Sequence, residues 1–297
     1  MTLVMVERLI DRVDALIAAR PARQRKAMLW GVAPTGDPHL GYLPALLTSR
    51  LLVQTGMETV LLLADFHAFL DDQKTSWEQL DERTRRYQEL LAPSFSRCLR
   101  AQAEYLHPRY VTGLIQFSES VELEQAVRFG NGTLRRDSDQ RRCSEVLYVL
   151  MQLFDLAYFD VGLAICGEDE APIYRGWEEV SSRSSHNDGV KFMYVPMCPG
   201  VEEPEMHASS TATNRVNLDS GREEVEAALE RNVQLAGGSL EAARLVSYCA
   251  QVVVPLFGRL VDAPELPPVG DNGFLPNLAD QVHAALEACR AEQLPHS

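Results

Sequence analysis

The chain has 297 residues, of which 46% are hydrophobic and 24% charged. This composition is typical of a globular protein with one large domain, or a domain and a smaller appendage. No run approaches 18 uninterrupted apolar residues and charge appears early in the chain, so we expect a cytoplasmic protein with no membrane segment. The formal net charge of −14 argues against strong non-specific binding of nucleic acid. The six cysteines form no C-x-x-C pair, so we expect reduced thiols and no protein-ligated metal.

The first part of the chain alternates between helical and strand-like patterns. Residues 3–17 place apolar side chains on one helical stripe, and residues 27–32 read as a buried strand. The Pro- and Gly-containing stretch 34–38 interrupts the pattern, which then resumes as an apolar helix over 40–54 and a buried strand over 59–65. A strand, a turn, a helix and a second strand form a βαβ unit, which predicts a parallel sheet.

The rest of the chain is expected to add helices and one more strand. A capping box at 75–78 predicts a charged helix to about residue 102, residues 145–156 have helical spacing, and 161–165 reads as a strand. The stretch 178–200 looks irregular. Helical patterns then run from residue 220, broken at 264–268 and 270–276. We therefore expect two domains, an α/β domain over 1–219 and a helical domain over 220–297.

The turn after the first predicted strand is suited to a nucleotide. Ligands of a doubly wound sheet bind beyond the carboxyl ends of its strands, which is where residues 34–42 lie. Gly36 and Gly41 allow close approach of the backbone, and His39 stands where the next helix begins, a position that favours phosphate. A histidine that only caps the helix is the alternative interpretation.

The whole segment resembles the HIGH region of tyrosyl- and tryptophanyl-tRNA synthetases, in which Pro-Ser/Thr-Gly precedes His-x-Gly-His. Pro34-Thr35-Gly36 and His39-Leu40-Gly41 match this pattern, and Tyr42 replaces the last histidine. The resemblance implies a class I synthetase domain, that is, an α/β Rossmann-like doubly wound parallel sheet with a C-terminal helical tail. It also implies catalytic roles at the ATP phosphates for His39 and Tyr42, and ATP binding by Gly31, Gly36, His39 and Gly41.

Two further segments resemble the archaeal-type tyrosyl enzymes. Residues 61–70, LLLADFHAFL, match a strand end of that group, and Tyr148, Gln152 and Asp155 fall on one face of a predicted helix. A solvent-facing stripe is the alternative for this face. The resemblance implies that Tyr148 and Gln152 bind the amino end of the substrate and that Asp155 binds a phenol hydroxyl.

The segment Gly167-Glu168-Asp169-Glu170 resembles the Gly-x-Asp-Gln motif of the same family. The resemblance implies that Gly167 and Asp169 bind ATP, Asp169 at the ribose, and that Glu170 replaces the glutamine at the substrate amine. Leu29 stands where the family has the tyrosine that shares the phenol hydroxyl, which leaves an indole or a modified tyrosine open. The implied amino-acid-binding residues are Leu29, His67, Tyr148, Gln152, Asp155 and Glu170.

The second ATP motif of the family, Lys-Met-Ser-Lys-Ser, corresponds here to residues 207–212. The hydroxyls of Ser209 and Ser210 remain, but the lysine positions are His207 and Ala212. The lysines stabilise the departing pyrophosphate, and each charge-assisted contact contributes roughly 1.5–3 kcal/mol. The resemblance implies catalytic roles for His207, Ser209 and Ser210, whereas a polar surface loop without such a role is the alternative.

Three functions stay open at this point. The first is ATP-dependent activation of a tyrosine-like aromatic amino acid as its aminoacyl adenylate, followed by transfer to tRNA. The second is transfer of the adenylate to a small-molecule acceptor, and the third is a non-catalytic binding paralogue. The expected ligands are ATP with Mg²⁺ as its counter-ion and an aromatic amino acid such as tyrosine or a derivative. The resemblance also implies a homodimer.

Overall fold

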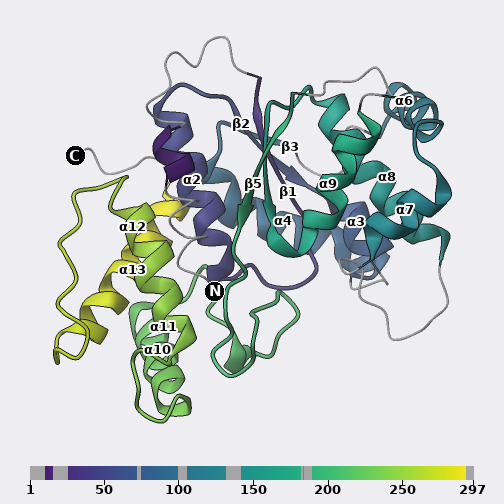
Figure 1. The fold of residues 1–297 in the computed structure, drawn as a ribbon. Helices are drawn as coiled ribbons and strands as arrows, with labels where there is room; N and C mark the ends of the chain where they lie inside the picture. The colour runs from purple at the N-terminus through teal and green to yellow at the C-terminus, as the bar shows by residue number, and fades with distance from the viewer. Residues whose placement is uncertain are drawn as a thin grey trace.

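A computed structural model describes residues 11–15, 26–71, 75–99, 106–131, 142–181, 183 and 189–291. Its centre is a five-stranded parallel sheet with the strand order β3-β2-β1-β4-β5 (Figure 1). The strands are β1 (Met28–Val32), β2 (Thr59–Leu63), β3 (Arg97–Leu99), β4 (Leu163–Gly167) and β5 (Lys191–Val195). The predicted Rossmann-like α/β fold is therefore confirmed. Most of the predicted helix over 3–17 lies outside the described residues; residues 11–15 are helical.

Alternation along the strands gives the sheet two buried faces, each with its own core. Trp30 of β1 points into a core formed with α2 (Leu43–Gln54), α4 (Leu80–Leu91) and the C-terminal helices. Its neighbour Leu29 points to the other face. The helices that cover that face are α6 (Pro108–Ser118), α7 (Leu123–Gly130), α8 (Cys143–Tyr158) and α9 (Ala171–Val180). The short helix α3 (Asp65–Leu70) follows β2 directly and packs against α8.

Two expectations about local structure were wrong. The charged helix expected to run to about residue 102 ends at Leu91. The segment Ala92–Ser94 forms a single 3₁₀ turn around Pro93, whose missing N–H cannot continue the α-helix, and β3 follows. The stretch 178–200, expected to be irregular, contains strand β5 at the edge of the sheet. Its alternation is weak because Lys191 is exposed while Met193 and Val195 are buried.

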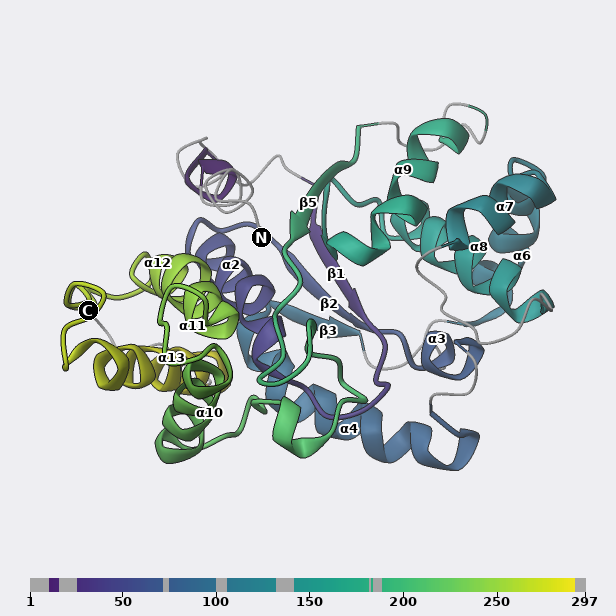
Figure 2. The same cartoon turned by 60° about the horizontal axis from the view of Figure 1, so that its bottom comes forward.

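The C-terminal helices lie beside α2 on one side of the sheet (Figures 1 and 2). They are α10 (Arg222–Leu235), α11 (Arg244–Tyr248), α12 (Val254–Phe257) and α13 (Phe274–Arg290), and a π-helical turn, Cys249–Val253, joins α11 to α12. Leu278 and Leu286 of α13 belong to the same hydrophobic cluster as Trp30 of the sheet. The domain boundary at residue 219 stays a prediction. In the described part of the chain, no helix is both long and apolar enough to cross a membrane.

One buried arginine fastens the last helix to the α/β domain. The Arg50 guanidinium on α2 donates to the Cys289 carbonyl at 3.1 Å, to Ser94 Oγ at 3.2 Å and to the Ala291 carbonyl. These carbonyls belong to the C-terminal end of α13, where a helix leaves acceptors without internal partners. A cation at this end also interacts favourably with the helix dipole.

We predict that Arg50→Met lowers the free energy of unfolding by about 3 kcal/mol, because it leaves buried carbonyls without their charged donor. Chemical denaturation followed by circular dichroism measures the change. The matched control is Arg85→Met, which removes an exposed ion pair with Asp81 and should cost under about 1 kcal/mol. Equal effects of the two substitutions would contradict the structural role of Arg50.

Candidate active site

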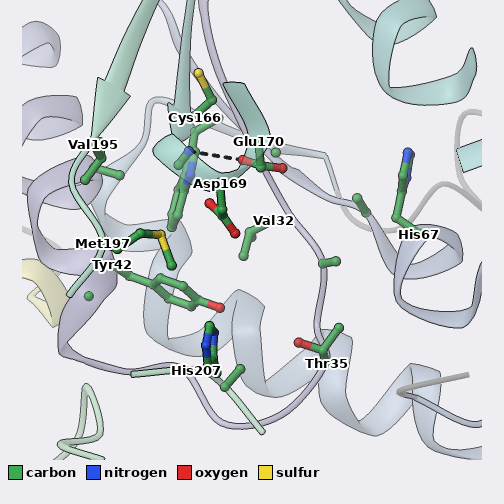
Figure 3. A pocket seen from close by; sticks show the side chains of 18 of the residues that line it. Val32, Thr35, Tyr42, His67, Cys166, Asp169, Glu170, Val195, Met197 and His207 are labelled. Carbon is green, nitrogen blue, oxygen red and sulfur yellow. Dashed lines mark hydrogen bonds between the residues drawn. The ribbon is translucent and has the colours of Figure 1, made fainter. Parts of the chain in front are cut away.

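A cavity of about 420 Å³ lies at the carboxyl ends of the strands, between the turn after β1 and the loop after β5. This is the edge where parallel α/β sheets place their ligands, and the volume is in the range of small-molecule sites. Figure 3 shows Tyr42 and His207 on one side of the cavity and Asp169 and Glu170 across from them. Residues from β1, β2, α8, β4 and the loop after β5 line it together.

His39 is the buried imidazole of the first turn. Its Nδ1 accepts a hydrogen bond from the Gly41 N–H at 3.2 Å, so the neutral ring carries its proton on Nε2. Burial first, and then the positive charges of Arg215 and His207, lower its pKa from 6.5 to about 3. His39 is therefore a neutral donor at physiological pH, suited to a hydrogen bond with a phosphate oxygen.

Tyr42 takes the place of the second histidine of the turn. Its ring lies 4.5 Å from the His39 ring, and its hydroxyl is 3.3 Å from that of Tyr87 on α4. Burial, with Tyr87 as the next contribution, raises the Tyr42 pKa well above its usual value. Tyr42 is thus an uncharged hydroxyl at the phosphate side of the cavity, where an imidazole could have carried a positive charge.

The turn after β1 and the loop at 207–210 touch through their backbones. Asp37 N–H donates to the Ala208 carbonyl at 3.1 Å, and a Cβ added at Gly36 would lie 2.0 Å from that oxygen. Arg215 fixes this contact from behind, with hydrogen bonds to the carbonyls of Ala208 (2.7 Å) and Ser210 (2.9 Å) and an ion pair with Asp37 at 2.5 Å. Only glycine fits at position 36 without separating the two loops.

The loop that replaces the lysine motif presents His207 to the cavity. His207 Nε2 lies 3.3 Å from Glu205 Oε2, a contact that favours the charged imidazolium. Ser209 lines the cavity. Ser210 does not line it, because its Oγ is used inside the loop, where it accepts from the His207 N–H at 3.0 Å and from Asn214 at 3.3 Å.

The opposite end of the cavity is acidic. Glu170 accepts from Gln152 Nε2 at 3.0 Å and from the Gly167 N–H at 3.1 Å. Burial first, and the neighbouring charge of Asp169 second, raise the Glu170 pKa from 4.5 to about 7. The other amide atom of Gln152, Oε1, is buried without a hydrogen-bond partner in the described part of the chain. A carboxyl group and an unused amide oxygen side by side are suited to an ammonium ion, which has three donors and no acceptor.

The structure brings most of the candidate site residues into this one cavity. Those that line it are Gly31, His39, Gly41, Tyr42, His67, Tyr148, Gln152, Gly167, Asp169, Glu170, His207 and Ser209. Gly36 and Ser210 lie directly behind the lining, in the contact between the two loops. Leu29 and Asp155 do not line the cavity. Leu29 belongs to the core on the opposite face of the sheet, and Asp155 is only 2% exposed, with its Oδ1 accepting from the Tyr110 hydroxyl.

Several lining residues had no part in the sequence prediction. Val195, Met197 and Cys198 follow β5, the strand that the sequence analysis did not recognise. Tyr174 sits in the first half of α9, four residues after Glu170. The position of Tyr174 could have been found, because residues four apart lie on the same side of a helix. The loop after β5 could have been found only from a recognised strand.

The cavity lining is poor in fixed positive charge. Among the described lining residues there is no lysine or arginine, whereas Asp71, Asp169 and Glu170 contribute three carboxyl groups. Within the described residues no group of three or more His, Cys, Asp and Glu side chains could hold a metal ion. The arrangement offers neutral donors at the turn, one imidazole at the loop and an anionic end for an amine.

Comparison with known proteins agrees with this geometry. Residues 22–246 match the family model of the class I tRNA synthetases (W and Y). The chain is 26% identical to the cytoplasmic tyrosine–tRNA ligase of Saccharomyces cerevisiae over 80% of this chain and 64% of that protein. It is also 26% identical to the tyrosine–tRNA ligase of Natronomonas pharaonis, over 79% of this chain and 71% of that protein. The cytoplasmic tyrosine–tRNA ligase of Gallus gallus is covered to only 53%, so the chain spans about half to two thirds of several curated relatives.

Solved structures share the fold. The tyrosyl-tRNA synthetase of Archaeoglobus fulgidus, complexed with L-tyrosine, superimposes with a TM-score of 0.74 and 23% identity, covering 98% of this chain and 99% of that one. The tryptophanyl-tRNA synthetase of Plasmodium falciparum gives a TM-score of 0.66 at 14% identity, covering 96% of this chain and 88% of that one. Since the family model matches about three quarters of the sequence, the chain belongs to the class I tRNA synthetases of the tryptophan and tyrosine group.

Proposed function

We propose that this protein activates an amino acid with ATP, forming an aminoacyl adenylate and releasing pyrophosphate. In this reaction a carboxylate oxygen of the amino acid attacks the α-phosphorus of ATP, and the bond to the β-phosphate oxygen breaks. The observation that carries the proposal is that one cavity holds both an amine-binding end, at Gln152 and Glu170, and a phosphate-binding end, at His39. Membership in the synthetase family supports the same reaction.

The amine-binding end explains why a glutamate is used. Ionised Glu170 would pair with the substrate ammonium, and Gln152 Oε1 would accept a second of its hydrogens. Tyr148 and Tyr174 border the same space. Asp169, directly before Glu170, is the residue proposed for the ribose hydroxyls, because a carboxylate accepts hydrogen bonds from neighbouring hydroxyl groups.

The phosphate-binding end acts with few charges. The Nε2–H of His39 and the hydroxyls of Tyr42 and Ser209 would donate to phosphate oxygens, and His207 would stabilise the departing pyrophosphate when protonated. ATP would bring its own Mg²⁺ as part of the substrate. With an imidazole in place of a lysine, we propose that the reaction is slow relative to a synthetase that carries both lysines.

The acceptor of the activated amino acid has two candidates, tRNA or a tRNA substitute, and a small molecule. The tRNA acceptor follows from kinship with tyrosine–tRNA ligases, as do a homodimer and a cytoplasmic location. The loss of the lysines and the net charge of −14 favour the small molecule. A non-catalytic paralogue remains the alternative to both, and the buried acceptor and donors of the cavity argue for at least ligand binding. Kinship also proposes a tyrosine-like aromatic substrate, but the buried positions of Leu29 and Asp155 argue against it.

The pKa of Glu170 predicts the pH dependence of amine binding. Because this pKa is raised to about 7, the carboxyl group is largely neutral at pH 5.5 and ionised above pH 7.5. The affinity for a non-reactive aminoacyl-sulfamoyl adenosine should therefore rise about 20-fold between these values, over which the substrate amine stays largely protonated. Isothermal titration calorimetry measures this slope.

Glu170→Gln should abolish the slope and fix the affinity near the low-pH value. Glu179→Gln, which changes an exposed carboxylate paired with Arg128, is the control and should keep the wild-type slope. A slope that survives in Glu170→Gln would remove Glu170 from the role of amine partner.

The leaving-group role of His207 can be tested by restoring a permanent charge. His207→Lys should raise the rate of amino-acid-dependent pyrophosphate exchange by about tenfold or more, because each 1.36 kcal/mol of stabilisation of the developing phosphate charge is tenfold in rate. His207→Ala should lower it. Thr213→Lys adds the same charge at an exposed position beside the loop and should leave the rate unchanged. No difference between the two lysine variants would show that the loop does not serve adenylation.

A further inference from the structure

The end of the family's amino-acid site that would receive a phenol ring is closed in this protein. Leu29 is 5% exposed and Asp155 only 2%, and neither lines the cavity. The neighbouring side chains Leu62, Leu156 and Ala164 are equally buried. There is consequently no open space beside Asp155 for the ring of a bound amino acid.

An internal tyrosine uses the polar group at this closed end. Tyr110 reaches in from α6, is fully buried, and donates its hydroxyl hydrogen to Asp155 Oδ1 at 2.7 Å. Its ring packs edge to face against Phe154 at 5.0 Å and Tyr158 at 4.9 Å, both on α8. Asp155 therefore already binds a phenol hydroxyl, and that hydroxyl belongs to the protein.

His67 and Tyr148 form the floor between the open cavity and Asp155. The two rings meet edge to face at 4.5 Å, and His67 Nε2 lies 3.2 Å from the Tyr148 carbonyl oxygen. Both residues line the cavity on one side while they belong to the packed contact between α3 and α8 on the other. A side chain that extends from the amine site at Glu170 meets this floor before it reaches Asp155.

We infer that this protein selects an amino acid with a compact side chain, one that ends at the His67–Tyr148 floor, and excludes tyrosine, with Tyr110 as the residue that enforces the exclusion. The inference rests on the proposed adenylation and names the substrate class for the same site. The floor offers polar contacts, because the imidazole of His67 and the carboxyl group of Asp71 border it. Serine, threonine and alanine are the representatives of this class to be compared with tyrosine.

The energetic reason is that a tyrosine substrate has to displace more than packing. It would have to break the Tyr110–Asp155 hydrogen bond and leave one buried hydroxyl without a partner, a change that costs far more than the loss of a methylene contact. Burial also raises the Asp155 pKa to about 8, so the group is mostly a neutral acid at pH 7 and attracts a second phenol only weakly. A compact side chain avoids both costs.

The test is equilibrium binding of aminoacyl-sulfamoyl adenosines, which need no catalytic step. Seryl, threonyl, alanyl and tyrosyl analogues are titrated into the wild-type protein by calorimetry. We expect at least one compact analogue to bind about tenfold or more tightly than the tyrosyl analogue. A tyrosyl analogue that binds as tightly as the best compact one would overturn the inference and leave the adenylation proposal intact. If none of the four binds, both fail.

Two variants of Tyr110 test the cause of the exclusion. Tyr110→Ala opens space beside Asp155 and should strengthen binding of the tyrosyl analogue about tenfold relative to the compact analogues. Tyr110→Phe removes only the hydroxyl, keeps the ring and should leave the preference for compact analogues in place. If Tyr110→Ala does not fold, the wild-type comparison still decides the substrate class. A folded Tyr110→Ala with unchanged preference would remove Tyr110 from this role.

Discussion

The cavity exists because Arg215 holds two loops together. Its guanidinium binds the carbonyls of Ala208 and Ser210 on one loop and the carboxylate of Asp37 on the other. Gly36 allows the two backbones to meet, since any side chain there would collide with the Ala208 carbonyl. With this contact made, His39 and His207 face the same space, and the positive charge of Arg215 helps to keep His39 neutral. The geometry of the phosphate end follows from this one clamp.

The same clamp also limits the chemistry. Arg215 lies near the phosphate end, but its charge is directed into Asp37 and the loop carbonyls, so it does not line the cavity. Across the cavity, Asp169 raises the pKa of Glu170, which makes the amine end sensitive to pH. A site with carboxyl groups at one end and neutral donors at the other is suited to holding an amine and a metal-bound phosphate chain. It is less suited to stabilising a departing pyrophosphate, and His207 is the residue positioned to supply that charge.

The sequence predicted the elements whose patterns are strong. The buried strands β1, β2 and β4 and the turn between β1 and α2 were recognised, and with them His39, Gly41 and Asp169. Strand β5 was missed because an edge strand with Lys191 at its start alternates poorly, and the lining residues after it were missed with it. The role of Asp155 could not be read from helical spacing. Spacing places it on the same face as Gln152, but only the packing of α6 against α8 brings Tyr110 to its carboxyl group.

The account depends most on the claim that the clamped loops form a nucleotide site, and one calorimetric comparison tests it directly. The magnesium complex of α,β-methylene-ATP is titrated into the wild type and into Gly36→Val, with Gly221→Ala as a control at a glycine that has no neighbouring atoms within 4 Å. The account predicts binding to the wild type and the control, and loss of binding in Gly36→Val, because a side chain at position 36 separates the loops. Equal binding to all three proteins, or no binding to the wild type, would contradict it.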